Sequence, residues 1–225
     1  GMVEVDLHLH TTFSDGTLSP VEVVKLCEER NLKVISLTDH DSTEGIQSAW
    51  ESLNDYPELT LIPGIELSTD IPGSEIHLLG YYVDYHDMTL QRTLEGFRTD
   101  RKNRSREMVK RLDELGIKLK WERVLELSGD QSIGRPHIAQ AMVEAGYIRY
   151  PREAFDKYIG RDGLAYVERP KLTPEEAVHI LVDNGALPVL AHPTYTGTKS
   201  DRGEICGLSE IIQNLKRIGL VGMEV

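Results

Sequence analysis

The sequence predicts an α/β fold in which strands alternate with helices. Apolar residues alternate with polar ones over residues 3–10, which is the period of two that a strand shows. Segments with the apolar spacing of an amphipathic helix follow the strand-like runs. The composition is that of a globular chain with a sizeable core, since 40% of its 225 residues are hydrophobic and 28% are charged.

The first ninety residues read as four strands and two helices. Ser19 and Pro20 open an amphipathic helix that continues to Arg30, because proline is tolerated in the first turn of a helix. A second helix is expected at about residues 43–54. The runs that read as strands are VDLHLH, KVISLTDHD, LTLIPGIELST and EIHLLGYYV. This order is typical of a parallel α/β sheet.

The middle of the chain has a different pattern. Residues 89–114 predict a long polar helix with a basic run, RTDRKNRSREMVKR, which we interpret as a solvated helix face. Short helical pieces follow, so we predict an inserted helical subdomain at 91–168 within an α/β domain formed by residues 1–90 and 169–225. The α/β pattern then resumes with a helix capped by Thr173, the strand ALPVLAHP, the helix LSEIIQNLKRIG and the strand LVGMEV.

Charge and composition exclude several classes of function. The formal net charge of −12 argues against broad binding of duplex nucleic acid, which needs a basic face. No apolar run approaches a membrane span, and no signal peptide opens the chain. Cys27 and Cys206 lie far apart and form no CxxC pair, so neither a disulfide framework nor a cysteine metal site is expected. We therefore expect a cytoplasmic protein with no membrane contact and no obligate protein partner.

Ligand-capable side chains recur at the ends of the expected strands. His8 and His10 share one face of the first strand, so both imidazoles can reach one point. In a barrel of alternating strands and helices, residues at the carboxyl ends of the strands converge on one mouth. A set of histidines and carboxylates without cysteine is compatible with zinc, manganese or iron. The other residues of this kind are Asp15, Asp39, His40, Glu66, His77 and His192.

Five motifs in order give the chain a family resemblance. HLHTTFSDG, TDHD, PGIEL, EIHLLGY and LAHP resemble the motifs of the polymerase and histidinol phosphatase (PHP) superfamily. The segment GRPHIAQAMVEAGY is similar to the branch of small metal-dependent phosphoesterases that includes the 3′,5′-nucleoside bisphosphate phosphatases, some of which also act as 5′-to-3′ exoribonucleases. The resemblance implies a distorted seven-stranded β/α barrel of the TIM-like kind with a trinuclear metal centre.

The resemblance also implies which residues bind each metal. His8, His10 and Glu66 hold the first metal, and Glu66 bridges to the second, which also binds His77 and His192. A carboxylate suits the bridging position because its two oxygens can bind two cations.

Asp15 and His40 hold the third metal in this assignment, and Asp39 orients a neighbouring ligand. Two to three divalent ions are expected, of manganese, zinc or iron, with manganese favoured by the family. The family also carries an Asp-x-His motif after its last strands, and this chain ends at Val225 without it. We expect a truncated sequence that lacks the C-terminal part of the barrel, with a true loss of these ligands as the alternative.

Arg135 and His137 are the expected substrate contacts. An arginine fork matches two phosphate oxygens, and a nearby histidine can add a hydrogen bond or a proton. The alternative is that Arg135 pairs with a surface carboxylate at the start of a helix. Secondary contacts are expected from Lys157, Arg161 and Tyr166.

These observations predict a metal-dependent phosphohydrolase. Its expected substrate is a small phosphorylated molecule, with a 3′,5′-nucleoside bisphosphate first and the 5′ end of a short RNA second, attacked by metal-activated water. The alternatives are a histidinol-phosphate phosphatase and a binding or regulatory module with a degenerate site. The expected catalytic residues are His8, His10, Glu66, His192 and Arg135.

Overall fold

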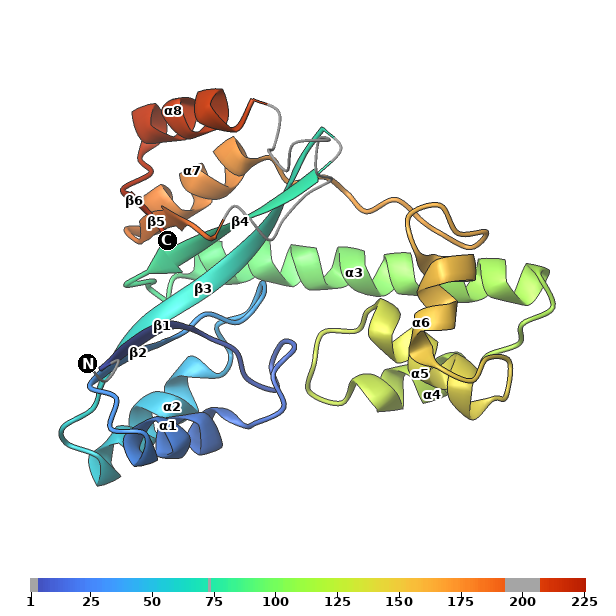
Figure 1. The fold of residues 1–225 in the computed structure, drawn as a ribbon, viewed down its shortest axis with the longest axis horizontal. Coiled ribbons are helices and arrows are strands. Elements are labelled where there is room, and N and C mark those ends of the chain that lie inside the picture. Colours follow the sequence, from blue (N-terminus) through green and yellow to red (C-terminus); the bar gives the residue numbers. More distant parts are fainter. Residues whose placement is uncertain (1–3, 73, 193–206) are drawn as a thin grey trace. The chain divides into compact units, whose positions relative to one another are not determined.

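The computed structural model describes residues 4–72, 74–192 and 207–225, and its ribbon is drawn in Figure 1. The chain divides into two compact units. Unit 1 comprises Gly1–Leu94 and Lys171–Val225, and unit 2 comprises Glu95–Pro170. Each unit has buried apolar side chains of its own.

Unit 1 is built on one sheet, whose six strands in the described part of the chain follow one another in sequence order. β1 pairs with β2 and β2 with β3 in parallel. β4 is antiparallel to both β3 and β5, and β5 and β6 are parallel. The strands are β1 (Val5–Leu9), β2 (Val34–Leu37), β3 (Thr60–Ile71), β4 (Ser74–Tyr81), β5 (Leu187–Leu190) and β6 (Gly222–Met223).

The long strand β3 changes partner halfway along its length. Residues Thr60–Pro63 pair with β2, and residues Gly64–Ile71 pair with β4 (Figure 1). The expectation of an all-parallel sheet is therefore wrong at β4. Only two residues connect β3 to β4, and a parallel neighbour would need a crossover of a dozen or more residues.

Helices cover the sheet of unit 1 near its two ends. α1 (Pro20–Glu29) and α2 (Ile46–Ser52) contact each other, and apolar residues of both pack with β2 and β3 in one buried cluster (Figure 1). α7 (Pro174–Asn184) packs against β3, β4 and β5, and it contacts α8 (Leu208–Ile218). A short 3₁₀ helix, η1 (Leu53–Asp55), extends α2.

Two helix starts follow directly from the sequence. The Ser19 hydroxyl accepts a hydrogen bond from the Glu22 N–H at the start of α1, and the Thr173 hydroxyl does the same for Glu176 in α7. Each cap satisfies one backbone donor that the first turn of a helix leaves unpaired. The predicted beginnings of these two helices are thus confirmed.

Unit 2 is helical. α3 (Met88–Glu114) begins in unit 1 and continues into unit 2. Its last turns pack with the other helices of unit 2 around buried apolar residues such as Met108, Leu112 and Met142. The other helices are α4 (Trp121–Ser128), α5 (Arg135–Glu144), α6 (Pro151–Ala154) and the π-helical turn η2 (Phe155–Ile159).

Among the described residues, the helices are all too short or too polar to cross a lipid bilayer.

Candidate metal centre

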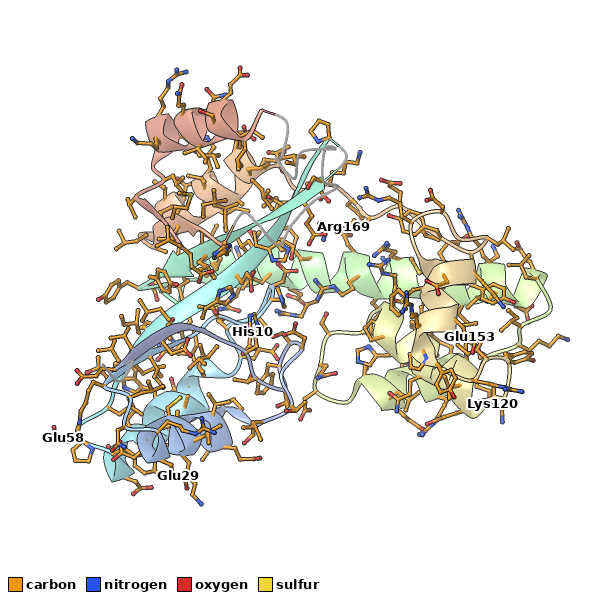
Figure 2. The ribbon with its side chains drawn as sticks, viewed as in Figure 1. His10, Glu29, Glu58, Lys120, Glu153 and Arg169 are labelled. Carbon is orange, nitrogen blue, oxygen red and sulfur yellow. The ribbon has the colours of Figure 1, made fainter. Side chains whose placement is uncertain are left out.

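The carboxylate of Glu66 lies at the centre of a group of histidines in unit 1. Glu66 is buried in the middle of β3, just past the point where this strand changes partner. Its Oε2 lies 3.0 Å from His8 Nε2 and 3.1 Å from His10 Nε2. His10 lies just past the end of β1, as labelled in Figure 2. Because residues two positions apart in an extended segment point to the same side, the imidazoles of His8 and His10 both reach one oxygen of Glu66.

Asp15 and His40 extend this group. The two oxygens of Asp15 lie 3.3 Å from His10 Nδ1 and 3.3 Å from His40 Nε2. The rings of His10 and His40 stack with their centroids 4.6 Å apart. The hydrogen bond to His40 lowers the pKa of Asp15 to about 2, so this carboxylate is ionised at neutral pH.

Backbone contacts between the segment after β2 and β3 hold His40 beside Glu66. The Glu66 N–H donates to the Asp39 carbonyl at 3.1 Å, and the Asp41 N–H donates to the Glu66 carbonyl at 3.0 Å. Residue 40 thus continues the parallel pairing of β2 with β3 by one isolated bridge. The local geometry of the TDHD segment follows from this pairing.

His77 approaches the other oxygen of Glu66. His77 lies on β4, and its Nδ1 is 2.6 Å from Glu66 Oε1. Its Nε2 is 2.6 Å from Glu75 Oε1, so the ring lies between two carboxylates. Glu66 therefore directs one oxygen towards His77 and the other towards the remaining histidines.

Contacts with carboxylates favour the protonated forms of His8 and His77 in the group around Glu66. The hydrogen bond to Glu66 raises the pKa of His8 to about 9. Burial opposes protonation of His77, but hydrogen bonds to Glu66 and Glu75 raise its pKa to about 9. Burial likewise disfavours the charged form of Glu66, yet hydrogen bonds from histidines hold its pKa well below the usual range. Protons on the histidines thus compensate the carboxylates, and divalent cations can replace these protons.

Three overlapping sets of ligand atoms lie close enough to bind metal ions. The atoms of each set lie within 4.8 Å of one another. The buried Nδ1 of His40 makes no hydrogen bond within the described part of the chain, so one imidazole nitrogen remains available as a ligand. The donor set of imidazoles and carboxylates fits zinc, manganese or iron. The sets are His8–His10–Glu66, His10–Asp15–His40 and His40–Glu66–His77.

His192 has a different position from the other expected ligands. Its backbone N–H donates to Glu224 Oε1 at 3.2 Å, immediately after β5. Its ring belongs to none of the three sets found among residues 4–72, 74–192 and 207–225. The structure thus brings together six of the seven expected metal ligands and places the backbone of the seventh against Glu224.

The sequence did not single out two acidic residues that contact the histidines. Glu75 bonds to His77, and Glu224 Oε2 lies 2.8 Å from His8 Nδ1. Glu224 lies near the end of the expected strand LVGMEV and directly follows β6, so the strand-end rule that found the other residues could have included it. Glu75 is two residues before His77 and shares its face of β4.

Asp39 stabilises the loop between His10 and Asp15. Its carboxylate accepts hydrogen bonds from the Thr11 N–H, the Thr11 hydroxyl and the Ser14 hydroxyl at 2.6–2.7 Å. The buried carboxylate thereby fixes the turn between His10 and Asp15.

The residues expected to bind substrate lie in unit 2. The guanidinium of Arg135 stacks over the Phe155 ring at 5.5 Å, and its Nη1 donates to the Ile159 carbonyl at 3.4 Å. The ring of His137 accepts from the Gly134 N–H through Nδ1, so Nε2 carries the proton and donates to Gln131 at 3.0 Å. Burial lowers the pKa of His137, which favours this neutral form.

A second arginine lies close to Arg135. Arg104 donates from Nε to the Val167 carbonyl at 2.6 Å and lies 5.3 Å from the centre of the Tyr166 ring. Burial lowers the pKa of its guanidinium, and the positive charges of Arg135 and of Arg169, labelled in Figure 2, lower it further. Lys157, in η2, and Arg161 are exposed.

The sheet of unit 1, with histidines and carboxylates gathered around Glu66, defines the class of protein. It is an α/β protein with a candidate divalent-metal centre. Comparison with known sequences identifies the family within this class. The profile of the PHP domain family matches residues 6–159, and the chain belongs to this family. The family resemblance found in the five ordered motifs is thereby confirmed.

Several known proteins are similar to this chain. The 5′-3′ exoribonuclease Rnm of Salmonella typhimurium is 35% identical over 189 residues, which make up 84% of this chain and 64% of that protein. The 3′,5′-nucleoside bisphosphate phosphatase of Chromobacterium violaceum is 29% identical over all of this chain and 77% of its own length. This chain thus spans less than two thirds of the length of the exoribonuclease.

A solved structure shares the fold. A candidate metal-dependent phosphoesterase from Bifidobacterium adolescentis superposes with a TM-score of 0.83 and is 27% identical, over 100% of this chain and 77% of the other. This similarity agrees with a PHP-type α/β fold.

Proposed function

We propose that the protein is a metal-dependent phosphohydrolase. The observation that carries this proposal is the convergence of four histidines from three separate segments of unit 1 on the single buried carboxylate of Glu66. Pairing with protonated histidines contributes little net stability to such an arrangement, because the cost of removing these charges from water offsets their attraction. Ligation of metal ions accounts for it directly.

Each ligand has a distinct part in this proposal. Glu66 is the bridging ligand, because Oε1 faces His77 while Oε2 faces His8 and His10. Asp15 and His40 complete the set on the other side of His10. Two to three cations of manganese, zinc or iron would be held there, with His192 as a further ligand. Bound cations supply an acidified water and positive charge for the phosphoryl oxygens.

The finer features of the fold are part of the proposal. We infer that the sheet belongs to a distorted seven-stranded β/α barrel and that unit 2 is a helical insertion in it. The antiparallel hairpin of β3 and β4 is the distortion, since a regular β/α barrel has parallel strands throughout.

The proposed substrate is a nucleotide with a terminal phosphate, first a 3′,5′-nucleoside bisphosphate and second the 5′ end of a short RNA. The names of the two sequence relatives support this choice. The charge of unit 2 supports it too: Glu95–Pro170 contains 16 lysines and arginines against 13 acidic residues, whereas the rest of the chain contains 9 against 24. A basic unit attached to a strongly acidic one suits an anionic substrate.

Arg135 is the residue proposed to contact the substrate phosphate. Arg104 interacts unfavourably with the positive charges of both Arg135 and Arg169, and an anion bound there would relieve this repulsion. His137 is the second proposed contact. Both of its ring nitrogens are already bonded, so a contact with substrate requires the exchange of its bond to Gln131.

The test is phosphate release by the complete natural protein loaded with Mn²⁺. Adenosine 3′,5′-bisphosphate, a short 5′-phosphorylated RNA, histidinol phosphate and an aryl phosphate are compared side by side. We expect selective release from the bisphosphate. His10→Ala should reduce the rate by at least about 100-fold, since it removes a ligand shared by two of the three sets.

The matched control is His86→Ala. His86 is exposed and contacts only the ring of Tyr85 among the described aromatic side chains, so its removal should leave the rate unchanged. Preferred release from histidinol phosphate would favour the alternative phosphatase. No release from any substrate, with metal bound, would favour a degenerate regulatory module.

A further inference from the structure

The side chain of Glu224 joins two segments that carry expected metal ligands. Its Oε2 lies 2.8 Å from His8 Nδ1, on the ring edge opposite to the one that faces Glu66. Its Oε1 accepts a hydrogen bond from the His192 N–H at 3.2 Å. The single carboxylate of Glu224 thus contacts the ring of His8, in β1, and the backbone of His192, just after β5.

The backbone of Glu224 is itself fixed by the sheet. The Glu224 N–H donates to the Leu190 carbonyl at 2.8 Å, directly after the parallel pairing of β5 with β6. The backbone is thus held by the sheet, and the carboxylate is held by its contacts with His8 and His192. Its side chain is 29% exposed, close to the 28% of His8.

When a cation is bound on the side of Glu66, the position of the Glu224 carboxylate decides where His8 keeps its proton. A neutral imidazole has one N–H and one lone pair. Each nitrogen of the His8 ring faces a carboxylate, Nδ1 at 2.8 Å from Glu224 and Nε2 at 3.0 Å from Glu66, so both can carry a proton when no cation is bound. A cation held between Nε2 and Glu66 would displace the proton of Nε2, and Glu224 would then keep the remaining N–H on Nδ1. Nε2 is thus the nitrogen available to share a cation with Glu66 and His10.

We propose that Glu224 is a positioning residue of the metal centre: it fixes the Nδ1–H tautomer and the ring orientation of His8, and it ties the segment of His192 to the same site. This inference rests on the proposed metal centre. Glu224 is not assigned as a ligand, because neither of its oxygens belongs to the three sets found among the described residues.

The first experiment uses the wild-type protein. Long-range ¹H–¹⁵N correlation spectra of the Zn²⁺-loaded protein report which nitrogen of His8 is protonated. We expect the Nδ1–H form with metal on Nε2. Protonation of Nε2 in the loaded protein would overturn the inference, and this result does not depend on the folding of any variant.

The second experiment substitutes the residue. In Glu224→Gln the amide can accept from only one of its two neighbours, so either the His192 N–H or the His8 N–H loses its acceptor. We expect the affinity for Mn²⁺, measured by calorimetry, to fall about 10–100-fold, as for other residues that orient metal ligands. Circular dichroism establishes that the variant is folded.

Glu210→Gln is the matched control. Glu210 lies exposed on α8, outside the three ligand sets, so the same chemical change should leave the Mn²⁺ affinity as in the wild type. Unchanged Mn²⁺ affinity in folded Glu224→Gln would overturn the positioning role while leaving the metal centre intact. Absence of Mn²⁺ binding in the wild type would instead overturn the proposed function.

Discussion

Asp39 shows how much a single buried side chain contributes to the geometry of the site. It is 3% exposed, and its two oxygens accept three hydrogen bonds from the loop between His10 and Asp15. In Asp39→Asn, an NH₂ group replaces one acceptor oxygen and faces donors. We expect the free energy of unfolding, measured with urea, to fall by about 1–3 kcal/mol, the cost of leaving buried donors unsatisfied.

Asp55→Asn is the control for this prediction. Asp55 is an exposed residue of η1, so the same change should alter the free energy of unfolding by no more than about 0.5 kcal/mol. Equal effects of the two substitutions would show that the bonds of Asp39 do not stabilise the loop.

Sequence patterns at the residue scale find side chains that share an element. The alternation of β1 placed His8 and His10 on one face, and both rings reach Glu66 in the structure. Glu224 could not be matched to His8 in this way. Their contact depends on the order of the strands and on how the sheet curls between its two edge strands, and neither is encoded in the local pattern around either residue.

At the scale of elements, the close approach of β2 and β3 depends on the absence of a side chain at Gly64. A Cβ at this position would lie 2.9 Å from the Leu37 carbonyl and would also meet the Ser36 hydroxyl. Gly64→Ala must therefore push β3 away from β2, two residues before Glu66. We expect a loss of about 1–3 kcal/mol in the free energy of unfolding, measured with urea, as for other overpacked sites.

Gly96→Ala is the matched variant. Gly96 lies within α3, and a Cβ there would meet no atom within 4 Å. Alanine should stabilise the helix by about 0.5–1 kcal/mol, because it loses less conformational freedom on folding. A loss of stability in Gly96→Ala as large as that in Gly64→Ala would contradict the steric argument.

The helices were more predictable than the sheet. Ser19 and Thr173 mark helix starts by local chemistry, and both caps form as expected. The direction of β4 was not read correctly, because periodicity distinguishes a strand from a helix but does not give the direction of its neighbour. The length of the connection between β3 and β4 contains that information.

At the scale of the whole molecule, the two units should respond differently to metal ions. All three ligand sets lie in unit 1, and unit 2 has its own buried core. A ligand that binds only the folded state stabilises it by about 2.7 kcal/mol at 100 times its Kd. We expect Mn²⁺ to slow hydrogen exchange in β2, β3 and β4, and the chelator EDTA to reverse this effect.

The amides of α5 provide the internal control, because this helix belongs to unit 2. Their exchange should be the same with and without Mn²⁺. An equal slowing in both units would show that they unfold as one cooperative body, contrary to this prediction.

The contact between His8 and Glu224 spans 216 residues of the chain, whereas the contact between Glu66 and His77 spans 11. At a synthesis rate of about 5–20 residues per second, His8 leaves the ribosome roughly 10–40 s before Glu224. The hairpin of β3 and β4 can form during that interval and bring His77 to Glu66. The emerging protein thus assembles its ligands in two stages, and the ring of His8 receives its permanent orientation only in the second.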